Sequence, residues 1–181
     1  MSLAALTGEG VYNFGEVLAT PLLSILDGTE NQYLFDLIKA MNTGDIDSYN
    51  SLVNLNSERY FNQPVLKTFH EKIQQKVVLL CLMDMIFKRS SHDRTIAYQD
   101  ISDKTRLPLD QVDWIVMKAL SLGLIKGSLD EVDQSVNVTW VQPKVLDHQQ
   151  IAIVVNQLTD WSDRVKRTLV AVEEQALELY V

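Results

Sequence analysis

The first part of the chain carries apolar residues at helical spacing, separated by turn signals. Residues 12–19 predict a short helix that ends before Pro21, because the residue preceding a proline disfavours helical geometry. Two further helices are predicted on either side of Gly44, which suits a helix end, and Asp45, which suits an N-cap. Their apolar positions are Leu34, Leu37, Ile38, Met41, Ile46, Tyr49, Leu52 and Val53. This arrangement predicts an antiparallel helical hairpin.

A single long helix is predicted over residues 62–89. Asn62 can cap it and Pro64 suits its first turn. The positive charges of Lys88 and Arg89 suit its C-terminus, where the helix dipole is negative. Its apolar positions are Leu66, Phe69, Ile73, Val77, Leu80 and Phe87. A helix of about 25 residues is roughly 38 Å long, which is enough to connect two parts of a fold. Residues 90–93 then read as a loop.

The next fifty residues combine strand and helix patterns. The predicted elements are a short β segment at 95–98, a helix at 99–105, a second helix from Leu109 to Gly123, and strands at 125–131 and 135–141. In the last strand Val136, Val138 and Trp140 alternate with polar residues and are predicted to share one face. Strand, helix, turn, helix and hairpin follow one another in the order of a winged helix-turn-helix.

After about Leu146 the chain carries one uninterrupted helical pattern. The apolar residues recur every three or four positions and are Ile151, Val154, Leu158, Trp161, Val165, Leu169, Val172, Ala176 and Leu179. This spacing is typical of a coiled-coil seam. Two interpretations stay open: the helix packs back on the winged helix, or it joins a bundle with helices of other chains.

These elements predict a mostly α fold of the α+β class. Helical hairpins lead into a winged helix-turn-helix with a small β-hairpin, and a long C-terminal helix follows. The expected parts are a helical-repeat part at 12–89, a winged-helix part at 90–144 and an assembly helix at 145–181.

Composition and charge narrow the function classes. The 181 residues carry a formal net charge of −8, which argues against general affinity for nucleic acid or an anionic membrane. Between Pro108 and Val141 the sequence has five acidic residues and two basic ones, Lys118 and Lys126, which gives this segment a net charge of −3. A nucleic-acid-binding surface needs several basic groups there. A winged-helix nucleic-acid binder is therefore the alternative, and a protein-binding module is the preferred interpretation.

The single cysteine, Cys81, lies in the apolar run from Val77 to Met83, where a buried thiol is expected and no internal disulfide can form. That run is far shorter than the ~20 residues of a membrane span. No basic segment precedes an apolar stretch at the start of the chain, so no signal peptide is expected. A cytoplasmic and nuclear protein without a membrane partner is predicted.

Sequence patterns of catalytic or cofactor sites are absent. His70, His92 and His148 are far apart and show no zinc-ligand spacing. The Gly8-Glu9-Gly10 segment lacks the lysine and the preceding strand of a phosphate-binding loop. We therefore expect no catalytic residue, no cofactor, no metal and no small-molecule substrate.

Several longer strings resemble the PCI domain family, whose members occur in the proteasome lid, the signalosome and initiation factor three. The strings are residues 12–16, 79–83, 116–128 and 138–143, together with Trp161. The resemblance covers nearly the whole chain from about Tyr12. Full-length members carry a longer N-terminal array of helical repeats, so the chain is expected to be a fragment of such a protein.

The resemblance implies a non-catalytic scaffold subunit of the 26S proteasome regulatory-particle lid, acting in ubiquitin-dependent degradation. A subunit of the signalosome or of initiation factor three is the alternative within the family. The implied partners are other PCI subunits of the lid, whose terminal helices gather into one bundle. The implied interface residues are Ile125, Lys126, Val136, Val138 and Trp140 on the hairpin, and Leu158, Trp161, Val165, Leu169 and Val172 on the last helix.

Overall fold

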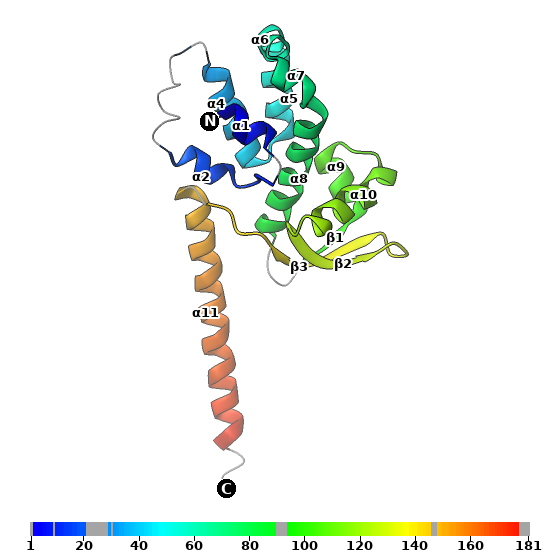
Figure 1. Cartoon of the computed structure of the whole chain (residues 1–181). Helices are drawn as coiled ribbons and strands as arrows, with labels where there is room; N and C mark the ends of the chain where they lie inside the picture. Colours follow the sequence, from blue (N-terminus) through cyan, green and yellow to red (C-terminus); the bar gives the residue numbers. More distant parts are fainter. Residues whose placement is uncertain are drawn as a thin grey trace. The chain divides into compact units, whose positions relative to one another are not determined.

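The computed structural model describes residues 2–8, 10–20, 29, 31–89, 94–145 and 148–177, without the side chains of 148–150, 153 and 175–177. These residues form two compact units, Met1–Val145 and Leu146–Val181 (Figure 1). The predicted loop at 90–93, the proline at position 21, His92 and Leu179 lie outside the described residues.

Short helices make up the first part of the larger unit. They are α1 (Ser2–Thr7), α2 (Phe14–Leu18), α4 (Gln32–Thr43), α5 (Ile46–Leu55), α6 (Ser57–Asn62) and α7 (Pro64–Thr68). The hairpin predicted around Gly44 is confirmed: α4 and α5 pack together, and Gly44 has a φ of 68°. The Asp45 side chain accepts hydrogen bonds from the backbone N–H groups of Asp47 and Ser48, as expected of an N-cap.

The long helix predicted over residues 62–89 is interrupted. Instead of one helix, α7 is followed by α8 (His70–Lys88), and Phe69 between them has non-helical dihedrals. Asn62 ends α6 and does not cap a helix, because Gln63 occupies the N-cap of α7. The Thr68 hydroxyl donates to the Pro64 carbonyl at 2.8 Å, a side-chain bond that competes with helix continuation.

The winged helix follows, in the predicted order. It contains β1 (Thr95–Ala97), α9 (Tyr98–Thr105), α10 (Leu109–Ser121), β2 (Ile125–Asp130) and β3 (Ser135–Val141). The strands form an antiparallel sheet in the order β1-β3-β2, so β3 is central and β2 lies at an edge. Gln134, in the turn of the hairpin, has a φ of 45°.

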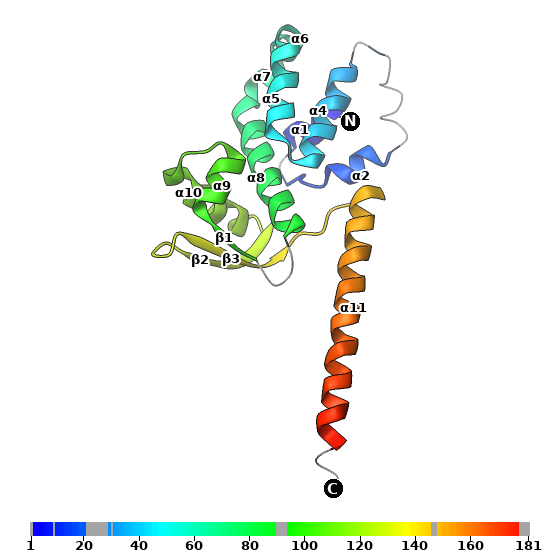
Figure 2. The same ribbon diagram turned by 180° about the vertical axis from the view of Figure 1, so that it is seen from behind.

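Helix α8 connects the helical part to the winged helix. It packs on α4 and α5 and also on α9, α10 and β3, and it lies between these groups in both views (Figures 1 and 2). From Val77 to Phe87 no side chain of α8 is exposed, and Val77, Leu79, Leu82 and Ile86 are almost fully buried. A helix segment surrounded by protein needs such a pattern, because each of its faces there meets another element.

The smaller unit contains α11 (His148–Leu177), a helix of 30 residues. Its length confirms the prediction of one uninterrupted C-terminal helix. The mostly α fold of the α+β class, with a winged helix and a small hairpin, is thus confirmed.

Candidate protein-interaction surfaces

One face of α11 carries exposed apolar side chains along most of its length. We call these residues, of which Val154 is half-buried and the others are exposed, the α11 stripe: Ile151, Val154, Leu158, Trp161, Val165, Leu169 and Val172. Trp161 is 62% exposed and Leu158 59%. The seven positions fall on one side of the helix because they recur every three or four residues. The described residues of the smaller unit form α11 alone, so within this part of the unit no second element covers the face.

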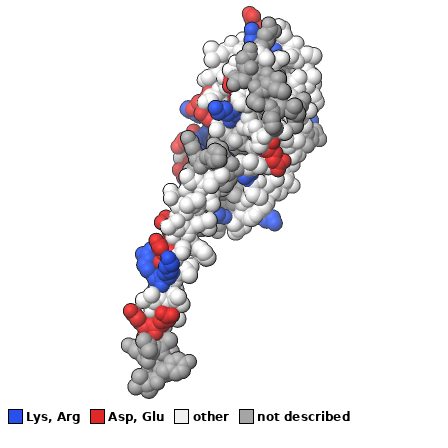
Figure 3. Space-filling view, turned by 90° about the vertical axis from the view of Figure 1, so that its left-hand side faces the viewer, with Lys and Arg blue, Asp and Glu red and all other residues white. Residues whose placement is uncertain are grey.

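The charged side chains of α11 gather in successive bands along the helix (Figure 3). Arg164, Lys166 and Arg167 form a basic band, and Glu173 and Glu174 form an acidic one. Lys166 lies 3.9 Å from Asp163 within the same helix. Charges of both signs beside an apolar seam are the pattern that sets register and orientation between packed helices.

At the edge of the sheet, a β-bulge changes which side chains face outward. Lys126 pairs with Trp140 but Gly127 pairs with Val138, so Thr139 is an extra residue in β3. The bulge reverses the alternation, so the prediction that Trp140 shares the face of Val136 and Val138 is wrong. Trp140 is 39% exposed, whereas Val136 and Val138 are buried.

Trp140 and Lys126 form a pair on the exposed side of the hairpin. The Lys126 Nζ lies 5.0 Å from the centre of the Trp140 ring, a cation–π contact. Gly127 is required at the bulge, because a Cβ there would lie 2.1 Å from the carbonyl oxygen of Asn137. Of the hairpin residues implied as interface candidates, Lys126 and Trp140 are thus accessible.

The other three hairpin candidates lie inside the domain. Ile125, Val136 and Val138 are each 1–2% exposed and belong to the hydrophobic core. Their side chains are occupied within the chain and are not available to a neighbour. What β2 does offer is its backbone, since an edge strand has N–H and C=O groups that can pair with another strand.

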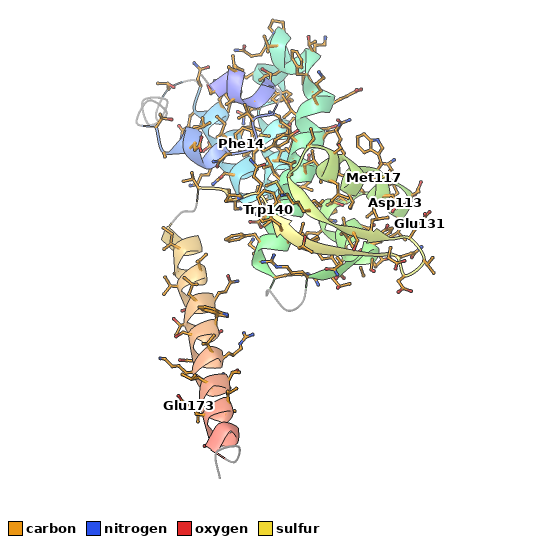
Figure 4. All side chains as sticks on the ribbon, turned by 60° about the horizontal axis from the view of Figure 1, so that its bottom comes forward. Phe14, Asp113, Met117, Glu131, Trp140 and Glu173 are labelled. Carbon is orange, nitrogen blue, oxygen red and sulfur yellow. The ribbon has the colours of Figure 1, made fainter. Side chains whose placement is uncertain are left out.

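An exposed apolar face on α10 was not identified from the sequence. Trp114 is 47% exposed and Met117 55%, although both lie in a helix whose other apolar residues form the core. Met117 points outward from α10 in Figure 4. A pocket of about 410 Å³ adjoins Trp114 and extends to Tyr49 on α5 and Gln75 on α8. In a DNA-reading winged helix this face would contact the major groove.

His70 and Cys81 both lie in structural environments. The hydroxyl oxygen of Tyr60 lies 3.1 Å from the Nδ1 of His70 and 3.4 Å from the hydroxyl oxygen of Tyr49. His70 thus belongs to a chain of hydrogen bonds beside the core. Burial raises the pKa of the Cys81 thiol to about 11. In the described part of the chain, no group of three or more His, Cys, Asp or Glu is placed to hold a metal ion.

The described residues also contain no helix that is both long and apolar enough to cross a bilayer.

Comparison with known proteins places these features in a family. The sequence signature of the PCI domain matches residues 35–140, and that of "PSD13 N-terminal repeats" matches residues 1–38. The chain is 41% identical over 179 residues to "26S proteasome non-ATPase regulatory subunit 13 homolog B" of Arabidopsis thaliana, which covers 99% of this chain and 46% of that protein. It is 34% identical over 182 residues to "26S proteasome regulatory subunit RPN9" of Saccharomyces cerevisiae, covering 100% of this chain and 45% of that protein.

A more distant relative is named for a different assembly. "Eukaryotic translation initiation factor 3 subunit M" of Neosartorya fischeri is 25% identical over 158 residues, which cover 87% of this chain and 33% of that protein. The chain thus spans less than half the length of these curated relatives. Since the PCI signature covers more than half of the chain, and since the winged helix is in place, the chain belongs to the PCI domain family.

Proposed function

We propose that the chain is part of a non-catalytic scaffold subunit of the 26S proteasome regulatory-particle lid, acting in ubiquitin-dependent protein degradation in the cytoplasm and nucleus. The observation that carries this proposal is the match of 34–41% identity, over essentially the whole chain, to proteins named as 26S proteasome regulatory subunits. Identity to the initiation-factor subunit is lower, at 25%.

In this proposal the chain assembles through helices and strand edges. Residues 12–89 and 90–144 form the two parts of the PCI domain, and residues 145–181 form the assembly helix. The α11 stripe packs against the terminal helices of other lid subunits in a bundle. Support comes from seven apolar positions on one face of a helix that has no core of its own, because such a face gains free energy when another helix covers it.

The hairpin supplies a second proposed contact. The edge of β2 pairs with a strand of a neighbouring PCI subunit, and Lys126 and Trp140 contact the same neighbour. The exposure of Trp140 and the edge position of β2 support this contact. Strand addition at a sheet edge provides main-chain hydrogen bonds, while an exposed tryptophan provides the large contact area that is common at protein interfaces.

Nucleic acid is not a partner in this proposal. The face of α10 that would enter a groove carries Asp110, Trp114 and Met117, with Lys118 beside Trp114, so it would bring no net positive charge toward phosphate groups. Binding to duplex DNA depends on neutralising several phosphates with Lys or Arg, whereas α10 carries a single such residue, Lys118. Two apolar side chains exposed there favour protein contacts instead.

Affinity capture of the tagged chain from cell extract at moderate salt, followed by mass spectrometry, tests the proposal. Recovery of proteasome regulatory-particle subunits in defined ratios is the expected result. Recovery of initiation-factor or signalosome subunits in their place would assign the chain to another PCI assembly. Duplex DNA or RNA captured without those complexes would contradict the scaffold function.

A further inference from the structure

The segment that follows β3, residues 142–145, is held by tertiary bonds although it forms no helix or strand. The backbone N–H of Gln142 donates to the Leu124 carbonyl at 2.8 Å, and the Nζ of Lys144 lies 3.0 Å from the Oδ1 of Asp84. In Figures 1 and 2 this segment leaves the sheet and runs to α2. A connecting segment is commonly mobile, so bonds to successive elements indicate that this one has a fixed path.

The last residue of the segment, Val145, is bound by a side chain from the early part of the chain. Its backbone N–H donates to the Oδ1 of Asn13 at 3.2 Å, across 132 positions of sequence. The Nδ2 of Asn13 donates to the Oε1 of Glu16 at 2.8 Å. This second bond orients the amide group so that its oxygen faces Val145. The helical part of the larger unit thus binds the residue at which that unit ends.

Gly15 allows the close approach of Val145 to α2. A Cβ at Gly15 would lie 2.7 Å from the carbonyl oxygen of Val145 and 2.8 Å from its Cβ. Gly15 is buried within α2, so glycine is needed here to leave space for the chain that passes over the helix. We call the contacts of Asn13 and Gly15 with Val145 the exit clasp.

The position of the clasp connects it to α11. Helix α11 begins at His148, three residues after Val145, whereas the sheet ends at Val141. A chain that is held up to Val145 has fewer free backbone dihedrals before α11 than one released at Val141. Because a helix loses conformational freedom when it enters a bundle, a shorter free connection lowers the entropy that association costs.

We propose that the exit clasp is a positioning device for assembly: by fixing Val145, Asn13 and Gly15 strengthen the association of α11 with the helices of partner subunits. This inference rests on the proposed function, in which α11 joins a bundle. It gives a role in assembly to two residues that lie on neither of the proposed contact surfaces. A contact that served stability alone would leave the association of a folded chain unchanged.

Amide hydrogen exchange in the 181-residue chain tests the clasp itself. Asn13→Ala removes the acceptor of the Val145 N–H. Gly15→Ala places a methyl group against Val145, although alanine favours the helical geometry of α2 more than glycine does. We expect the Val145 amide to exchange about tenfold faster in both variants, while the Gln142 amide keeps its rate. An unchanged rate at Val145 in both variants would overturn the clasp.

Capture of proteasome regulatory-particle subunits by the same tagged variants tests the role in assembly. About tenfold less capture is expected for Asn13→Ala and for Gly15→Ala, with circular dichroism as the check on folding. Asn54→Ala, at an exposed position on α5, is the matched control and should leave both exchange and capture unchanged.

Two results of the capture would overturn the inference, and they are distinguishable. Capture at the native level by both clasp variants, with faster exchange at Val145, would remove the role in assembly and leave the scaffold function intact. Failure of the unsubstituted chain to capture any regulatory-particle subunit would contradict the scaffold function, and the role of the clasp in assembly with it.

Discussion

The Nζ of Lys144 lies 3.0 Å from the Oδ1 of Asp84, and the two side chains are only 11% and 8% exposed. Asp84 belongs to α8, whereas Lys144 follows β3, so this ion pair joins the end of the winged helix to the central helix. Lys88 contacts the other carboxylate oxygen at 2.6 Å, but its side chain is 60% exposed. The same carboxylate thus takes part in a buried pair and in a solvent-exposed pair.

Asp84→Ala is expected to destabilise the chain by about 3 kcal/mol, because it leaves the ammonium of Lys144 buried without a partner. Lys88→Ala should cost less than about 1 kcal/mol, since exposed pairs contribute little. Urea unfolding followed by circular dichroism measures both changes. Similar losses for the two variants would show that burial of the Asp84–Lys144 pair does not determine its contribution.

Gly44 provides a second test of packing around α8. Its φ is +68°, and a Cβ there would lie 3.0 Å from the Leu80 carbonyl oxygen and 3.1 Å from the Asp84 Cβ. Gly44→Ala should therefore lower the free energy of unfolding by more than the roughly 1–2 kcal/mol that left-handed geometry alone costs.

Gly123→Ala is the matched control for this substitution. Gly123 has nearly the same φ, +69°, but a Cβ at this position would meet nothing within 4 Å. The difference between the two variants in urea unfolding isolates the steric contact from the backbone strain. Equal destabilisation would mean that the turn at Gly44 moves away from α8 at little cost.

Lys76 predicts a pH dependence of stability. Burial lowers its pKa to about 8 from an ordinary value of 10.5, so between these pH values the unfolded chain binds a proton that the folded chain has released. The stability contribution of this site therefore rises with pH across that window, by up to about 3 kcal/mol, and is constant below it. Unfolding of the native chain and of Lys76→Met, compared from pH 7 to 10.5, should show this rise in their difference. A difference that is constant with pH would contradict the prediction.

Apolar periodicity predicted the helices well, because each buried face continues over several turns. The hairpin of α4 and α5, the helices of the winged helix and α11 all have such faces. Helix α6 was missed because Tyr60 is its only fully buried residue, too little for a periodic signal. The interruption at Phe69 was missed because the apolar spacing continues across it.

Whether a side chain points to the core or to the outside was harder to predict than whether it lies in a helix or a strand. Alternation in β3 identified Val136 and Val138 as one face, but the pattern does not state whether that face meets the core or a neighbour. The bulge at Thr139 has no apolar signature, so the outward position of Trp140 followed only from the strand register. Likewise the hydrogen bonds from Lys76 to the carbonyls of Ala5, Leu6 and Gly8 join residues about seventy positions apart, which no local pattern indicates.

The most direct test of the scaffold function is the assembly of α11 variants. Leu158→Glu places a charge on the α11 stripe, whereas Asn156→Glu places the same residue on the opposite side of the same helix. Tagged versions of the 181-residue chain are compared for the amount of proteasome regulatory-particle subunits captured, with circular dichroism as the check on folding. We predict a loss of at least about tenfold for Leu158→Glu, because a buried charge without a partner is costly, and no loss for Asn156→Glu. Equal capture by both variants would contradict the proposal that α11 joins a helical bundle.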